Sequence, residues 1–255
     1  MAVNSPAFDN PFARGAATLA AQPREIHAPK ADIILAIDAC ASMRPLWQQL
    51  KKDAPSITTM LDTAGARAGL TAADIRLRIV TFRDMYMHEA AFACSPFCCF
   101  PHDAPQLTDF IASVRPSGEG GPCTSGLEAL LIALHSPWRR EDGMRHRVAI
   151  ITDSAAYQPD EPLRKFDLRY SSILGEFLPE TQQDVPYQLE DLRRLWRDGI
   201  GTIDNWNSRI LLYTISAAPW TQMVPWPRIT PRQMFAEKIR RLQTQELFND
   251  ILSTL

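Results

Sequence analysis

The sequence contains no hydrophobic run that approaches the roughly 18 apolar residues of a membrane-spanning helix. Residues 1–29 lack the basic start and apolar core of a secretory signal, and their Pro, Ala and Asn content indicates a flexible N-terminal arm. Five cysteines without such a signal favour a reducing compartment over a disulfide framework. We therefore expect a cytoplasmic protein that does not enter a membrane.

Motifs of the common enzyme classes are also missing. There is no phosphate-binding Gly-rich loop that ends in Lys-Ser/Thr, no His-Glu-x-x-His and no Gly-x-Ser-x-Gly. A thiol-dependent enzyme is a remote alternative, because a nucleophilic Cys40 or Cys123 needs a histidine that only the fold can bring to it. We expect the chain not to be an enzyme.

Charge of one sign does not dominate either. The net charge of −2 gives no global reason to expect nucleic acid or an anionic membrane as a partner. Two local basic clusters, Arg139–Arg147 and Lys238–Arg241, are interleaved with or flanked by acids. We interpret both as solvated faces.

What the sequence does contain is enough apolar residue, 45% of 255, for one large domain, which we place at residues 30–255. Three apolar runs, Ile33–Asp38, Val148–Asp153 and Arg209–Ser216, have the pattern of strands that are buried on both faces. Helical patterns alternate with them. The prediction is an α/β fold with a doubly wound, mainly parallel central sheet flanked by helices.

The remaining elements follow from the same periodicities. A long crossover at about residues 155–208 separates the second and third runs, and it carries two of the predicted helices. The predicted helices are Arg44–Ala64, Pro105–Val114, Ser125–His135, Leu163–Phe177, Leu189–Trp196 and Pro231–Leu255, and the further strands are Arg76–Arg83 and a short antiparallel Met87–Phe92.

The first apolar run ends at a carboxylate, Asp38, which is followed only by small residues. An acid in that position is costly to bury unless another group pairs with it. In open α/β sheets the carboxyl ends of the strands are also where ligands bind. Asp38 therefore indicates a candidate site at this end of the sheet.

Three segments resemble von Willebrand factor A (VWA) domains, the fold shared with integrin I domains. Asp38-Ala39-Cys40-Ala41-Ser42 is similar to the Asp-x-Ser-x-Ser loop of that family. Gly118–Gly126 stands in the place of its glycine-rich loop, and Val148–Ser154 in the place of the strand that ends Thr-Asp-Gly. The order of the three segments is also that of the family, and the long crossover resembles the intracellular bacterial type.

The resemblance implies a metal-ion-dependent adhesion site, usually for Mg²⁺, which prefers hard oxygen ligands. The site is degenerate, because Cys40 places a soft sulfur where the family has a serine. The position of the metal-binding threonine falls near Gly121, so Thr124 serves only if the loop path shifts. The candidate metal ligands are Asp38, Cys40, Ser42, Thr124 and Asp153, around a Mg²⁺ ion that is weakly bound or absent.

The function that the resemblance implies is a protein–protein interaction module, in which an acidic side chain of the partner completes the metal coordination. The alternative is a metal-independent scaffold or assembly subunit that binds through Trp/Pro-rich loops such as Ala218–Pro227. Cys94, Cys98, Cys99 and His102 invite a zinc interpretation, but the phenylalanines between them favour an apolar loop that packs on the domain.

Overall fold

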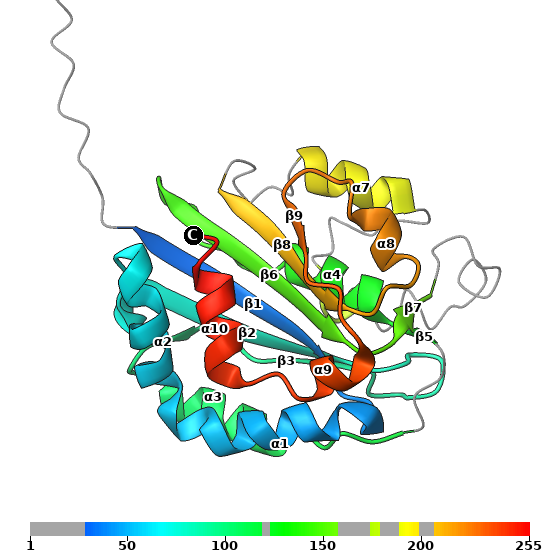
Figure 1. Cartoon of the computed structure of the whole chain (residues 1–255), viewed down its shortest axis with the longest axis horizontal. Coiled ribbons are helices and arrows are strands. Elements are labelled where there is room, and N and C mark those ends of the chain that lie inside the picture. The colour runs from blue at the N-terminus through cyan, green and yellow to red at the C-terminus, as the bar shows by residue number, and fades with distance from the viewer. Residues whose placement is uncertain (1–28, 119–122, 158–173, 179–188, 199–206) are drawn as a thin grey trace, which may run out of the picture.

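A computed structural model describes residues 29–118, 123–157, 174–178, 189–198 and 207–255. In this part of the chain a seven-stranded sheet has the order β3-β2-β1-β6-β8-β9, with β4 also paired to β2 (Figure 1). All neighbours are parallel except β3 and β4, which run antiparallel to β2. The strands are β1 (Lys30–Asp38), β2 (Ile75–Phe82), β3 (Phe92–Cys94), β4 (Cys98–Cys99), β6 (Met144–Thr152), β8 (Ser208–Thr214) and β9 (Ile229–Pro231). A separate parallel pair joins β5 (Cys123–Thr124) to β7 (Ala155–Ala156).

Helices cover both faces of the sheet, so the fold is the predicted doubly wound α/β architecture. One face carries α1 (Arg44–Asp53), α2 (Ile57–Gly65), α3 (Ala104–Ser113), α9 (Ala236–Arg240) and α10 (Thr244–Leu252). The other face carries α4 (Gly126–Leu134), α7 (Leu189–Asp198) and α8 (Trp220–Met223).

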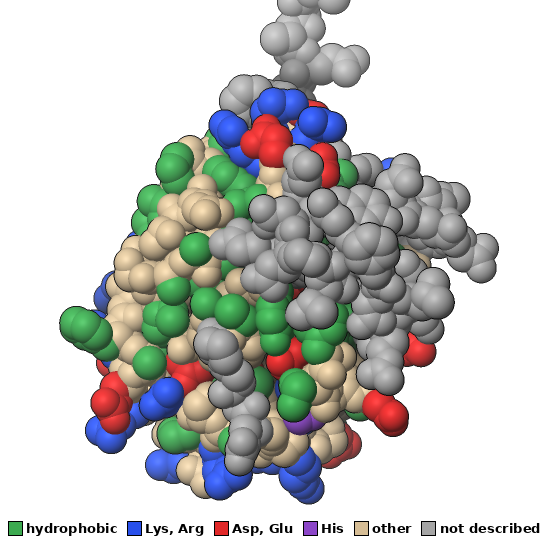
Figure 2. Space-filling view, turned by 90° about the vertical axis from the view of Figure 1, so that its right-hand side faces the viewer, with side chains coloured by type: hydrophobic (Ala, Val, Ile, Leu, Met, Phe, Trp, Pro, Cys, Tyr) green, Lys and Arg blue, Asp and Glu red, His purple; other side chains and the backbone are tan. Residues whose placement is uncertain are grey.

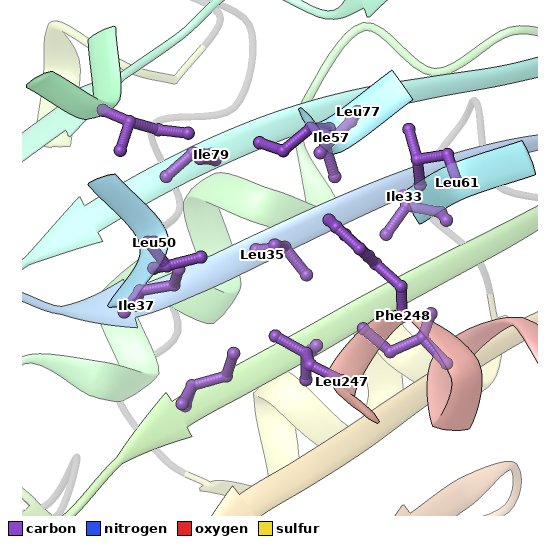
Figure 3. Packing of buried hydrophobic residues seen from close by; sticks show 14 of the residues in the cluster. Ile33, Leu35, Ile37, Leu50, Ile57, Leu61, Leu77, Ile79, Leu247 and Phe248 are labelled. Carbon is purple, nitrogen blue, oxygen red and sulfur yellow. The ribbon is translucent and has the colours of Figure 1, made fainter. Parts of the chain in front are cut away.

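The apolar run in β1 fills both layers of core, because side chains alternate between the faces of a strand. Ile33, Leu35 and Ile37 point toward α1, α2 and α10, as Figure 3 shows, and each is at most 1% exposed. Ile34 and Ala36 point to the opposite face and are fully buried against α4. Each large aliphatic side chain buried in this way stabilises the fold by roughly 1.5–3 kcal/mol.

The three buried strands are confirmed, while three other elements differ from the prediction. The helix predicted over Arg44–Ala64 is divided into α1 and α2 by a 3₁₀ turn at Ala54–Ser56. Pro55 lies in that turn and has no N–H for a continuous helix. The antiparallel strand is β3, Phe92–Cys94, and not Met87–Phe92, because Phe92 pairs with the last residue of β2.

The single helix predicted over Pro231–Leu255 is also wrong. Pro231 ends strand β9, which pairs with β8, and the chain then forms two short helices, α9 and α10. Ile239 and Phe248 are both fully buried in the same core layer, and the break at residues 241–243 lets each helix turn its apolar side inward. Predictions for residues 1–28, for most of the 155–208 crossover and for most of Leu163–Phe177 lie outside the described residues.

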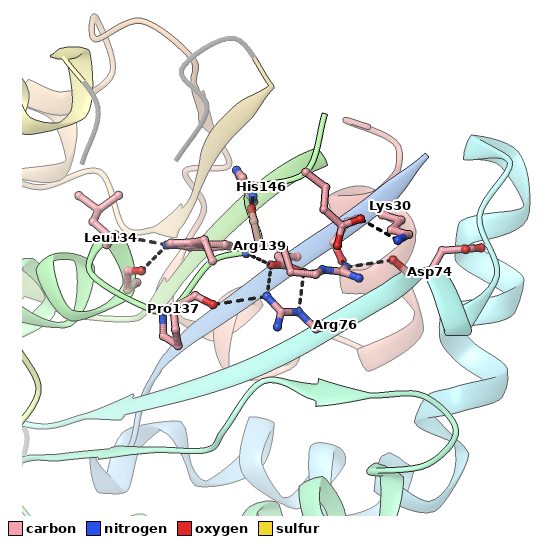
Figure 4. Close-up of polar contacts among 12 residues, drawn as sticks. Lys30, Asp74, Arg76, Leu134, Pro137, Arg139 and His146 are labelled. Carbon is pink, nitrogen blue, oxygen red and sulfur yellow. Dashed lines mark hydrogen bonds and ion pairs between the residues drawn. The ribbon is translucent and has the colours of Figure 1, made fainter. Parts of the chain in front are cut away.

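A buried ionic network stabilises the end of the sheet at which the parallel strands begin (Figure 4). Asp32 is fully buried and accepts hydrogen bonds from Nε and Nη2 of Arg76 and from the backbone N–H and Nε of Arg139. Burial raises the pKa of Asp32, but the hydrogen bonds and charges of the two arginines outweigh that effect and hold the pKa below 3.8. The network ties β1 to β2 and to the loop before β6.

Candidate functional site

Strands β1, β2, β6 and β8 end at one edge of the sheet, at the right of Figure 1. We define the carboxyl edge as the segments that follow these strands and β9, residues 38–43, 83–88, 153–157, 215–226 and 232–240. Figure 2 views this side, where hydrophobic side chains lie near the centre and Lys and Arg side chains lie along the lower margin. The carboxyl edge is where ligands of open α/β sheets bind.

Asp38 is fully buried at the end of β1, and both of its carboxyl oxygens accept hydrogen bonds from the protein. Oδ1 accepts from the backbone N–H of Cys40 at 2.8 Å, and Oδ2 accepts from Oγ1 of Thr152 at 2.7 Å. The pKa of Asp38 is raised to about 6, because the effect of burial outweighs that of the hydrogen bonds from Cys40 and Thr152, and the nearby charge of Asp153 adds to the rise. Asp38 thus joins the end of β1 to the end of β6.

Asp153 follows β6, and its side chain is 1% exposed. Its Oδ1 accepts hydrogen bonds from the hydroxyls of Ser42 at 3.1 Å and Ser154 at 3.3 Å. Its Oδ2 accepts a hydrogen bond from Nε of Arg240, the last residue of α9, at 2.5 Å. The structure therefore brings Ser42 and Asp153 together, as the sequence predicted, and adds an arginine that the sequence analysis did not select.

Cys40 is 1% exposed, and its thiol lies beside the carboxylate of Asp38, so the structure brings these two predicted site residues together. Burial and the neighbouring charge of Asp38 raise the pKa of the Cys40 thiol. The thiol is therefore held in its neutral form, which is neither a good metal ligand nor a good nucleophile.

Thr124, the other uncertain ligand, is fully buried in β5, beside β7. Its hydroxyl donates to the carbonyl of Ala155 at 3.4 Å. Gly121, where the family's threonine was expected, lies outside the described residues. No hydrogen bond of the described residues joins Thr124 to either carboxylate.

Arg83, directly after β2, holds the loops of the carboxyl edge together. Its guanidinium donates from Nε to the carbonyl of Ala39 at 3.1 Å, from Nη2 to that of Arg115 at 2.7 Å and from Nη1 to that of Ala90 at 3.3 Å. The backbone N–H of Ser117 donates to the same Ala39 carbonyl at 3.1 Å. The loop after β1 and the segment before residue 119 are thereby fixed against each other.

Asp84 is a second residue that the sequence analysis missed, although it follows β2 much as Asp38 ends β1. It is 2% exposed and accepts hydrogen bonds from the hydroxyl of Tyr157 at 2.7 Å and from the backbone N–H of Tyr86 at 2.9 Å. Its carbonyl accepts from the N–H groups of Met87 and His88. Asp84 thus anchors a tight turn that presents Met87.

The candidate ligands, as they are arranged, do not fit a divalent ion. Both carboxylates accept hydrogen bonds from protein donors, which are neutral groups for Asp38 and include a cation for Asp153. One of those donors, Arg240, carries the positive charge that a metal would supply. Among the residues that the structure describes, no three His, Cys, Asp or Glu side chains are grouped to hold a metal ion.

The segment from Cys94 to His102 and the tryptophans serve mostly to pack the domain. Cys98 is fully buried in β4, whereas His102 lies exposed and pairs with Asp103. The tryptophans within the described ranges are buried and therefore act as core anchors: Trp47, Trp138, Trp196, Trp220 and Trp226. Trp220 donates from Nε1 to the carbonyl of Ser154 at 3.0 Å. This hydrogen bond fixes the turn that follows Asp153.

No protein-family model and no curated protein sequence matches this chain. Two solved structures illustrate its likeness to known proteins. Proximal thread matrix protein 1 from the mussel byssus, with a zinc-occupied MIDAS motif, is 15% identical at a TM-score of 0.46, over 88% of this chain and 45% of that one. The pilus adhesin SpaC from Lactobacillus rhamnosus GG, in its open conformation, is 14% identical at a TM-score of 0.36, over 50% of this chain and 15% of that one.

The chain thus spans less than half the length of either structure. Identities and TM-scores in this range do not assign a family. In the described ranges, no helix has both the length and the apolar character needed to cross a membrane.

Proposed function

We propose that this chain is a protein–protein interaction module of VWA type, which recognises its partner through the loops of the carboxyl edge. One observation carries the proposal. Among the described residues, the two large hydrophobic side chains that stand exposed are Met87, at 72%, and Phe235, at 88%. Both follow strands that end at the carboxyl edge.

The backbone around each side chain is fixed, which favours recognition over random exposure. Met87 lies in the turn held by Asp84, and Phe235 follows Met234, whose N–H donates to the carbonyl of Thr214 at the end of β8. Exposed apolar side chains that gather on one surface of a protein are typical of contact sites. Because the two stand on one edge, a single partner surface is able to cover both.

The partner in this proposal is another protein and not nucleic acid or a membrane, since the net charge is −2. We place the module in a bacterial cytoplasm, as the sequence resemblance implies, because no disulfide joins the cysteines of the described residues. An enzymatic role is not part of the proposal, and the buried Cys40 thiol with its raised pKa supports that choice.

A capture experiment tests the proposal. The tagged chain is crosslinked in extract of its source organism, alongside Met87→Asp/Phe235→Asp and a control, Ala66→Asp/Ala73→Asp. The control adds the same charges at exposed positions of the amino-terminal end of the sheet. A specific partner captured by wild type and control and lost from the edge variant supports the proposal. Equal capture by all three places recognition elsewhere and contradicts it.

A further inference from the structure

Asp153 is a buried carboxylate whose counterion comes from the chain itself. Its side chain is 1% exposed, whereas the Arg240 side chain that contacts it is 37% exposed. The arginine therefore lies between the carboxylate and solvent. An approaching cation meets the guanidinium of Arg240 before it meets Oδ2 of Asp153.

We propose that Arg240 is the resident cation of the carboxyl edge and that its guanidinium masks a latent divalent-metal site formed by Asp38, Ser42 and Asp153. The inference concerns the chain alone and does not require the proposed partner. Arg240, which lies outside the three motif segments, would then be the residue that prevents metal binding.

The position of Arg240 is imposed by the fold and not by a flexible side chain alone. Ile239, its neighbour, is fully buried in the core layer that also holds α1 and α10. Helix α9 ends at Arg240, and the N–H of the next residue, Arg241, turns back to the carbonyl of Lys238. With Ile239 anchored, Arg240 is directed to the end of β6.

Charge and geometry explain why the arginine and a metal ion exclude each other. The guanidinium of Arg240 places a fixed positive charge directly against Oδ2 of Asp153, where a metal ion would bind. A divalent ion beside a fixed guanidinium would also be repelled, strongly so in a partly buried setting. Mg²⁺ and Mn²⁺ demand several oxygen ligands in near-octahedral geometry, and Asp153 is central to any such set here.

The chain offers a matched control in Arg241. This residue carries the same charge, directly follows α9 and is 76% exposed, and its contact is with Glu237 at 3.9 Å. Arg240→Ala and Arg241→Ala therefore remove the same net charge, but only the first releases Asp153.

The test is a Mn²⁺ titration, by calorimetry and electron paramagnetic resonance, of wild type, Arg240→Ala, Arg241→Ala and Arg240→Ala/Asp153→Asn. We expect Arg240→Ala to bind one Mn²⁺ at least about tenfold more tightly than wild type, because a repelling charge is removed and a ligand freed. Arg241→Ala should behave as wild type, and the double variant should lose the gain.

Thermal unfolding in EDTA and in excess MnCl₂ provides a second readout, since an ion that binds only the folded state raises its melting temperature. Only Arg240→Ala should show such a rise. If Arg240→Ala does not fold in EDTA, Arg240→Gln, which fills part of the volume without the charge, replaces it in every measurement. Equal Mn²⁺ binding by wild type and the Arg240 variant, or none by a folded Arg240 variant, overturns the inference.

Discussion

Arg240 donates from Nε to Oδ2 of Asp153, and this contact joins two residues that are 87 positions apart. It connects the end of a short surface helix, α9, to the turn after the central strand β6. The same carboxylate is bound on its other oxygen by Ser42, from the loop after β1. One carboxylate thus holds together three segments of the carboxyl edge.

The first prediction concerns the stability that this contact provides. Arg240→Ala should lower the free energy of unfolding by about 1–2 kcal/mol, because Asp153 keeps a buried charge without its partner. The effect stays below that of a fully buried pair, since Arg240 is 37% exposed and water replaces part of the contact. Arg241→Ala should change the free energy by less than about 0.5 kcal/mol. Urea unfolding in EDTA measures both, and equal losses would contradict the role of Asp153.

The second prediction is a pH dependence that arises from Asp32. Its folded pKa lies below 3.8, so its contribution to stability is present at neutral pH and is lost as the pH falls below about 4. Asp32→Asn should cost about 3 kcal/mol at neutral pH, because Arg76 and Arg139 lose a buried partner. The difference between the two proteins should shrink in acid. Urea unfolding at several pH values checks this, and a constant difference would argue against it.

The third prediction concerns the packing beneath the turn after Asp153. A Cβ at Gly126 would lie 2.7 Å from Cζ2 of Trp220, a fully buried side chain. Gly126→Ala should therefore cost about 1–3 kcal/mol and alter tryptophan fluorescence. Gly175→Ala is the control, since nothing lies within 4 Å of the Cβ it would add. Equal stability of the two variants would show that Trp220 has room to move.

The fourth prediction concerns how accessible the cysteine thiols are to alkylation. Cys99 is exposed, whereas Cys40 is buried and its thiol pKa is raised by burial and by Asp38. Alkylation of the folded chain should modify Cys99 early and leave Cys40 intact until the protein unfolds. Mass spectrometry of peptides over a time course gives the order. Early modification of Cys40 would instead support the thiol-enzyme alternative.

The sequence predicted the parts of the fold that local pattern encodes. Unbroken apolar runs identified β1, β6 and β8, and a carboxylate at the end of the first run pointed to the carboxyl edge. Their parallel arrangement then explains why Ser42 and Asp153 meet, since parallel strands end at one side of the sheet.

Arg240 could not be predicted in the same way. Arg240 belongs to the basic cluster Lys238–Arg241, and such clusters are usually solvated. The spacing of apolar residues in this region also suggested one continuous helix. The actual break after α9 depends on Ile239 and Phe248 packing separately in one core layer, which is a tertiary effect. A contact across 87 positions leaves no local signal.

If Arg240 supplies the positive charge at the carboxyl edge, the proposed recognition of a protein there should not need a metal ion. The most direct measurement is the affinity of the captured partner for the purified chain, by calorimetry in EDTA and in excess MgCl₂. We expect equal affinity in both buffers, and a loss of at least about tenfold, or ~1.4 kcal/mol, for Met87→Asp/Phe235→Asp. Binding that requires Mg²⁺, or that is unchanged in the edge variant, would contradict it.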